Sequence, residues 1–219
     1  MYHYNSFIMN NAHYQKVLKA IDGHAELLVV SKYHSVEEAM EYYALGVRHF
    51  GENRMQELLP KVEAMPKDIA WHFLGHLQTD KVKKVVPAVS MIQSLDSIAL
   101  ADKIESVCAR IGKNMPCLIE LLLAEDEGKK TGLSSDELDA LMEHCAQLPH
   151  IEVKGIMVMG PNVDDVDQIR ATFQKGYRIF KGLQGRYPNV SVYSAGMSDD
   201  FEIALEEGST QVRIGSYLF

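Results

Sequence analysis

Short apolar runs alternate along the chain with longer stretches whose apolar residues recur at helical spacing. Residues 27–30 form a continuous run of Leu and Val, which is typical of a strand buried on both faces of a parallel sheet. Ser35 and Glu38 follow with the spacing of a capping box, and the apolar positions after them share one helical face. The chain thus opens with a strand and a helix, the repeating unit of parallel α/β proteins.

The same unit recurs to the end of the chain. Further strand-like runs lie at residues 48–50, 70–74, 90–93, 117–122, 153–158, 190–193 and 211–214. The helices between them are expected to start near Asn53, Gln78 and Asp199, and one opens with a second capping box at Ser134 and Glu137. Eight strands alternating with helices predict a single (β/α)8 TIM-barrel domain over residues 1–219, with a doubly wound open sheet as the alternative.

The residues before the first strand also have helical spacing. Their apolar positions are Ile8, Tyr14, Val17, Leu18 and Ile21. We expect an extra N-terminal helix here, placed to close the floor of the barrel.

The net charge indicates which classes of molecule the protein is not expected to bind. The 219 residues include 22 Lys and Arg against 30 Asp and Glu, a net charge of −8, which disfavours binding to nucleic acid or anionic lipid. No apolar run reaches the ~18 residues of a membrane helix, and the first residues do not resemble a secretion signal. Three widely spaced cysteines (Cys108, Cys117 and Cys145) fit reduced, buried thiols. We therefore expect a cytoplasmic protein without nucleic-acid or membrane partners.

Lys32 directly follows the first predicted strand. In a barrel, reactive groups lie where strands end and loops begin. A neutral lysine amine at that place can attack an aldehyde and form a Schiff base. The alternative is a solvated lysine with no chemical role.

Two turns rich in Gly and Ser follow the last two strands, at residues 194–198 and 215–216. Such turns let backbone N–H groups approach an anion, and the loops after strands 7 and 8 are where barrels hold phosphate. The alternative is two ordinary turns. Arg213, between them, is a candidate phosphate ligand, ion-pair partner or donor to a ring nitrogen, and we place it across the barrel mouth from Lys32.

Other motifs do not indicate a metal or a nucleotide. His72 and His76 are four residues apart but span a strand and a turn, so their rings are expected to diverge rather than share a metal. The sequence contains neither the P-loop nor the dinucleotide-binding glycine motif.

Taken together, these stretches resemble the pyridoxal phosphate homeostasis protein family, single-barrel relatives of the alanine racemase N-terminal domain. The matching segments are residues 29–32, 50–53, 71–78, 130–132, 155–157, 194–199 and 212–216. Each is short, but their order along the chain makes the set specific.

The resemblance implies a fold-type III barrel that holds pyridoxal 5'-phosphate (PLP) as a Schiff base on Lys32. It places Asn53 and His76 around the cofactor and Arg213 opposite the pyridine nitrogen. The residues at or near the phosphate would be Ser194, Gly196, Met197, Ser198, Gly215 and Ser216. Because arginine keeps its proton, a ring paired with it is a poorer electron sink than one paired with a carboxylate.

The sequence departs from the family at residues 121–123, all leucine, where relatives carry a polar Gln-Val-Asn stretch. A polar contact from the fifth strand is therefore expected to be missing.

The first functional hypothesis is a carrier or regulator of the PLP pool without robust turnover, a monomer or weak dimer that passes the cofactor to apo PLP-dependent enzymes. The chain leaves no room for the domain that supplies the second acid/base of alanine racemases. The alternative is a PLP-dependent amino-acid racemase with Lys32 as its base. A third class is an aldolase or sugar-phosphate isomerase that needs no cofactor.

Overall fold

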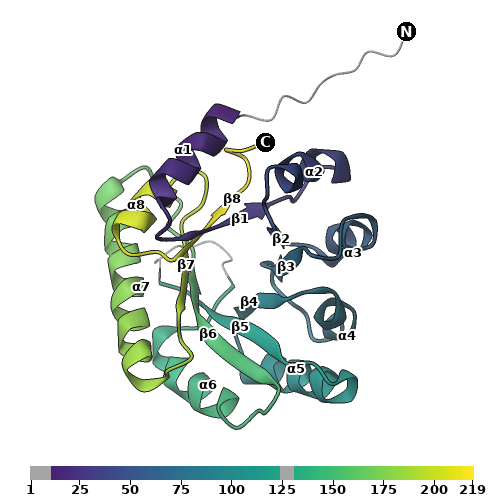
Figure 1. The fold of residues 1–219 in the computed structure, drawn as a ribbon. Coiled ribbons are helices and arrows are strands. Elements are labelled where there is room, and N and C mark those ends of the chain that lie inside the picture. The colour runs from purple at the N-terminus through teal and green to yellow at the C-terminus, as the bar shows by residue number, and fades with distance from the viewer. Residues whose placement is uncertain (1–10, 124–130) are drawn as a thin grey trace.

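The computed structural model describes residues 11–123 and 131–219, in which eight parallel strands form a closed barrel surrounded by helices (Figure 1). The strands are β1 (Glu26–Val30), β2 (His49–Glu52), β3 (Ala70–Phe73), β4 (Met91–Leu95), β5 (Met115–Leu121), β6 (Ile151–Val158), β7 (Val192–Ala195) and β8 (Gln211–Ile214). Each overlaps a predicted run, so the expected (β/α)8 barrel is confirmed.

The pairing of β1 with β8 closes the sheet. Leu28 lies beside Arg213, and Val29 beside Ile214, in parallel register. The open-sheet alternative is therefore wrong. Lys32 and Arg213 also come from neighbouring strands, which corrects their expected placement on opposite sides of the mouth.

Helices fill the layer outside the barrel (Figure 1). They are α1 (Asn11–Ile21), α2 (Val36–Ala44), α3 (Met55–Ala64), α4 (Val82–Val85), α5 (Ile98–Ile111), α6 (Leu138–Cys145), α7 (Val166–Arg186) and α8 (Phe201–Glu206), with 3-10 turns η1 (Val86–Ala88) and η2 (Ser135–Glu137). In the described residues, no helix combines the length and apolar character needed to cross a bilayer.

The N-terminal helix α1 exists as predicted but does not close the barrel floor. It lies in the outer layer beside α8 (Figure 1), and its Tyr14 ring meets Tyr42 of α2 edge to face at 5.7 Å between centroids. It occupies the position between α8 and α2, and the residues that follow β8 form a turn. Ile8 of the predicted pattern lies outside the described residues.

Helix starts follow local hydrogen bonding. The first capping box is confirmed, since the Ser35 hydroxyl accepts from the Glu38 N–H at 3.2 Å and the Glu38 carboxylate accepts from the Ser35 N–H at 2.6 Å. The second is wrong, because the Ser134 hydroxyl donates to the Glu137 carboxylate and caps no N–H. The helix expected from Gln78 is the short α4, which gives way to a 3-10 turn at Pro87, a residue without an N–H.

The main apolar core lies between the sheet and the helices. Tyr193 of β7, for example, points outward and donates its hydroxyl to the Phe173 carbonyl of α7 at 2.8 Å. The barrel interior instead receives several polar side chains that are almost fully buried: His72, Gln93, Glu120, Ser194, Gln211 and Arg213. This polar interior lies directly beneath the barrel mouth.

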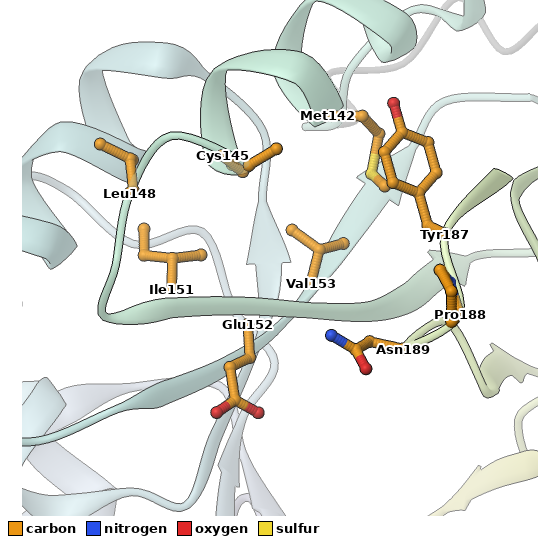
Figure 2. A pocket seen from close by; sticks show the side chains of 10 residues that line it. Met142, Cys145, Leu148, Ile151, Glu152, Val153, Tyr187, Pro188 and Asn189 are labelled. Carbon is orange, nitrogen blue, oxygen red and sulfur yellow. The ribbon is translucent and has the colours of Figure 1, made fainter.

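A second apolar region is visible in the outer layer (Figure 2). It is a pocket of about 280 Å³ between α6, the first residues of β6 and the Tyr187–Asn189 turn. Cys145 lies on its wall, and burial raises the pKa of this thiol to about 11. All three cysteines are buried free thiols, as predicted.

Candidate functional site

A cavity of about 240 Å³ opens at the carboxyl end of the barrel. It is lined by Val30, Lys32, Asn53, Leu74, Met157, Met159, Met197, Ser198, Asp199, Arg213, Gly215 and Ser216. Seven of the ten residues predicted for the site are in this lining. The structure thus brings together residues from β1, β2, β7 and β8 that lie far apart in the sequence.

Lys32 reaches the cavity from the loop after β1. Its Nζ lies 5.8 Å from the centre of the Tyr33 ring. Tyr33 has a left-handed backbone (φ 69°), a conformation that bulky residues rarely adopt, and its N–H donates to the Glu57 carboxylate at 2.7 Å. The Tyr33 side chain is 71% exposed, so it forms an open rim beside the lysine.

A buried carboxylate lies behind this loop. The Ser31 hydroxyl donates to Glu52 Oε1 at 2.7 Å, and Lys61 Nζ pairs with the same oxygen at 2.5 Å. Burial raises the pKa of Glu52, against the effect of its bonds to Lys61 and Ser31. The second carboxylate oxygen has no hydrogen-bond partner in the described part of the chain.

Arg213 forms part of the cavity floor and is almost fully buried. One terminal nitrogen donates to Ser194 Oγ at 2.7 Å, and the other donates to the Val158 carbonyl at 2.9 Å. Burial lowers the pKa of Arg213 to about 10, while Asp200 and Glu120 act in the opposite direction. Among the described residues, no carboxylate forms an ion pair with this guanidinium. A buried cation of this kind suits an acceptor atom in the cavity.

The two Gly/Ser turns are joined by one hydroxyl. Ser198 Oγ accepts from the Gly215 N–H at 3.4 Å and from the Tyr217 N–H at 3.1 Å. Gly196 sets the first turn with φ 92°, and a Cβ there would lie 2.6 Å from that of Ala204. The predicted turns therefore form one continuous wall of the cavity.

Three predicted residues are outside the lining. Ser194 lies beneath Arg213, and Gly196 packs against α8. His76 is on the surface, where its Nδ1 lies 3.3 Å from an Asp96 oxygen. His72 is buried in the barrel, so the two histidine rings diverge as expected.

Sequence reasoning missed Glu120 of β5. This side chain is 2% exposed, accepts from the Thr131 hydroxyl at 3.1 Å and has a second oxygen without a partner among the described residues. Burial raises its pKa. The fifth strand therefore supplies a buried polar group one position before the leucines at 121–123, although Glu120 is outside the cavity lining. Lys130, in a matching segment, lies outside the described residues.

Comparisons with known proteins agree with this architecture. Residues 10–219 match the family described as alanine racemase, N-terminal domain. The chain is 40% identical over 198 residues to the pyridoxal phosphate homeostasis protein of Aquifex aeolicus, covering 89% of this chain and 86% of that protein.

Solved structures extend the agreement to three dimensions. PipY of Synechococcus elongatus without PLP superposes with a TM-score of 0.90 at 32% identity, covering 95% of this chain and 98% of PipY. PipY with PLP bound superposes with a TM-score of 0.86 at 30% identity, with the same two coverages. The resemblance noted in the sequence is confirmed. This chain belongs to the pyridoxal phosphate homeostasis proteins, within the family of the alanine racemase N-terminal domain.

Proposed function

We propose that this protein binds PLP in the barrel mouth and carries or regulates the PLP pool, with Lys32 as the attachment residue. One observation carries the proposal: a single cavity is lined by a lysine amine, a buried guanidinium and two joined Gly/Ser turns. PLP carries groups that match all three: an aldehyde, a ring nitrogen and a phosphate. The binding of PLP by PipY, which has the same fold, supports this assignment.

The phosphate would be held by the two turns. Ser198 and Ser216 line the cavity, and their backbone N–H groups have no hydrogen-bond partner in the described part of the chain. Gly196 and Gly215 keep this wall compact, since a Cβ on Gly215 would lie 3.0 Å from the Val30 carbonyl. A dianion would therefore meet unpaired donors there.

The ring nitrogen would face Arg213. The guanidinium is tied at its far side to Ser194 and Val158, which leaves further N–H groups for an acceptor in the cavity. Asn53 contributes a buried Oδ1 without a partner among the described residues, so it is also available to a ligand. His76, paired with Asp96 at the surface, would lie at the edge of the site.

When PLP is bound, its aldehyde supplies a carbonyl that condenses with a primary amine to give an imine and water. Lys32 provides the amine, and exposed Tyr33 beside it leaves the loop accessible from outside. An accessible attachment residue suits a carrier that hands PLP to apo PLP-dependent enzymes. A monomer or weak dimer would keep this face open.

The test is direct. Purified protein is mixed with PLP, and the visible absorbance is recorded before borohydride reduction and peptide mapping. We expect an absorbance band and a reduced adduct on Lys32, and their loss in Lys32→Ala with an unchanged circular dichroism spectrum. A trapped adduct on another lysine would overturn the role of Lys32, and the absence of any adduct in the wild type would overturn PLP binding.

The enzymatic alternative has a separate measurement. The PLP-loaded protein is incubated with single amino acids, and the products are separated on a chiral column. Racemisation above the rate of free PLP would replace the carrier with a racemase-like function.

A further inference from the structure

A continuous set of hydrogen-bonded side chains crosses the barrel interior beneath the candidate site. It begins at Arg213, whose terminal nitrogen donates to Ser194 Oγ at 2.7 Å. The Ser194 hydroxyl in turn donates to Gln93 Oε1 at 2.8 Å. These three residues come from β8, β7 and β4, so the contacts span the barrel.

The NH₂ group of the Gln93 amide is also hydrogen-bonded, to two acceptors. Its Nε2 donates to Gln211 Oε1 at 2.6 Å and to His72 Nδ1 at 2.9 Å. If the amide were reversed, its oxygen would face the Gln211 oxygen and its NH₂ would face Ser194. The two acceptors therefore fix which end of Gln93 points toward Ser194.

The set continues to the floor of the barrel. His72 Nε2 lies 3.3 Å from His49 Nδ1, and His49 Nε2 lies 3.1 Å from a Glu26 oxygen. Gln211 Nε2 donates to the other Glu26 oxygen at 2.5 Å. A carboxylate only accepts, so both branches run in one direction, with every donor pointing from Arg213 toward Glu26.

Because these side chains are buried, the direction of their hydrogen bonds determines which atoms of Ser194 face Arg213. Gln93 and Ser194 are fully buried, so water cannot replace a lost partner without opening the barrel. Ser194 has one proton, and because Gln93 Oε1 accepts it, the lone pairs of the hydroxyl face the guanidinium. Burial also lowers the pKa of His72 to about 3, which keeps the ring neutral and its Nδ1 free to accept.

We infer that Gln93 is a positioning residue that sets the orientation of the Arg213 guanidinium through Ser194, without itself lining the cavity. One consequence rests on the proposed function: Gln93 then tunes the contact between Arg213 and the PLP ring. The orientation itself is a property of the apoprotein. It can therefore be measured separately from PLP binding.

The experiment compares three single variants and one double variant of the full chain with the wild type, and a further variant, Arg213→Lys, serves only to assign signals. Gln93→Met keeps the length of the side chain and removes its polar atoms, and Ser194→Ala removes the acceptor for Arg213. The double variant combines the two changes. Ser94→Ala is the matched control, because Ser94 is fully buried on the same strand and its hydroxyl has no partner in the described part of the chain.

The first readout is the set of ¹⁵N side-chain signals of Arg213 in the apoprotein, assigned by their loss in Arg213→Lys. We expect them to broaden or shift in Gln93→Met and Ser194→Ala, and to stay in place in Ser94→Ala. Unchanged signals in a folded Gln93→Met protein would overturn the inference, whether or not PLP binds. If Gln93→Met does not fold, Ser194→Ala still decides whether the hydroxyl orients Arg213, and unchanged signals in that variant would likewise overturn the inference.

The second readout is PLP binding, followed by visible absorbance. Gln93→Met should raise the Kd of PLP by about tenfold, the effect of losing one hydrogen bond to a buried charged group, and should shift the absorbance maximum. In the double variant the increase should match that of Ser194→Ala alone, because Gln93 acts through Ser194. Independent, additive effects would contradict this route. Wild-type protein that does not bind PLP would refute the proposed function and leave the NMR result standing.

Discussion

Lys61 of α3 donates a hydrogen bond of 2.6 Å to the carbonyl oxygen of Ser31, the residue immediately before Lys32. The same ammonium pairs with Glu52 at the end of β2. Both Lys61 and Glu52 are almost fully buried, so this pair links a helix and two strands at the point where the chain enters the cavity. The backbone that presents Lys32 is thereby fixed from behind.

Removing the Lys61 ammonium should leave the Glu52 carboxylate buried and without a charged partner. We expect Lys61→Met to destabilise the protein by about 3–5 kcal/mol, because the buried Glu52 carboxylate loses its charged partner. The loss should be smaller at acid pH, where Glu52 is protonated. Urea denaturation at several pH values measures this.

The double variant Lys61→Met/Glu52→Gln is the control. It removes both charges and should recover most of the lost stability, since replacing a buried pair costs less than breaking it. A Lys61→Met protein as stable as the wild type would show that the pair does not anchor the loop.

Glu120 gives a prediction for the pH dependence of stability. Its pKa is raised in the folded protein, so the unfolded chain releases the proton first as the pH rises. Glu120 therefore contributes stability below its unfolded pKa and loses it as the pH rises through its folded pKa. Glu120→Gln should raise the Tm at pH 8 and leave it nearly unchanged at pH 4. The opposite pH trend would show that the carboxylate is stabilised in the fold.

The strands were predictable because they bury their outer faces. In β1 and β6, runs of Leu, Ile, Met and Val leave little choice except a buried strand. The turns after β7 and β8 were also predictable, because Gly and Ser mark them locally. The count of eight strand-like runs was sufficient for the barrel, and the turns together with the family resemblance supplied seven residues of the cavity lining.

The polar interior could not be predicted from the sequence. Gln93 stands next to Ser94 and Gln211 next to Thr210, and polar residues in a strand usually mark solvent-facing positions. Gln93 and Gln211 meet only because the barrel closes, and closure depends on the pairing of β1 with β8. The same long-range pairing brings Arg213 beside the strand that precedes Lys32, and no local sequence pattern predicts this pairing.

A substitution at Ser198 tests whether its hydroxyl holds the two Gly/Ser turns together. Ser198→Ala removes the acceptor shared by the Gly215 and Tyr217 N–H groups, so the wall that faces the phosphate should loosen. We expect the Kd of PLP to rise by roughly fivefold, the effect of about 1 kcal/mol, and the Lys32 adduct to remain. Absorbance titration after dialysis measures the change, with Ser134→Ala at an exposed position as the control. Complete loss of PLP would instead indicate that the hydroxyl is the principal phosphate ligand.

Gly196 provides the sharpest test of the turn geometry. Its φ of 92° disfavours any side chain, and an added Cβ would lie 2.9 Å from the Phe201 Cα. Gly196→Ala should destabilise the protein by about 2–5 kcal/mol, through backbone strain and overpacking together. It should also weaken PLP binding, since the first Gly/Ser turn must shift away from the second.

The control for this change is Gly182→Ala in α7. A Cβ there meets no atom within 4 Å, and its backbone is helical, so alanine should stabilise the protein by about 0.5–1 kcal/mol. Thermal unfolding and PLP titration of the two variants, side by side, separate the effect of the turn from that of adding a methyl group. Equal stability of the two variants would mean that the turn adopts another conformation, and the phosphate wall would then need a different set of donors.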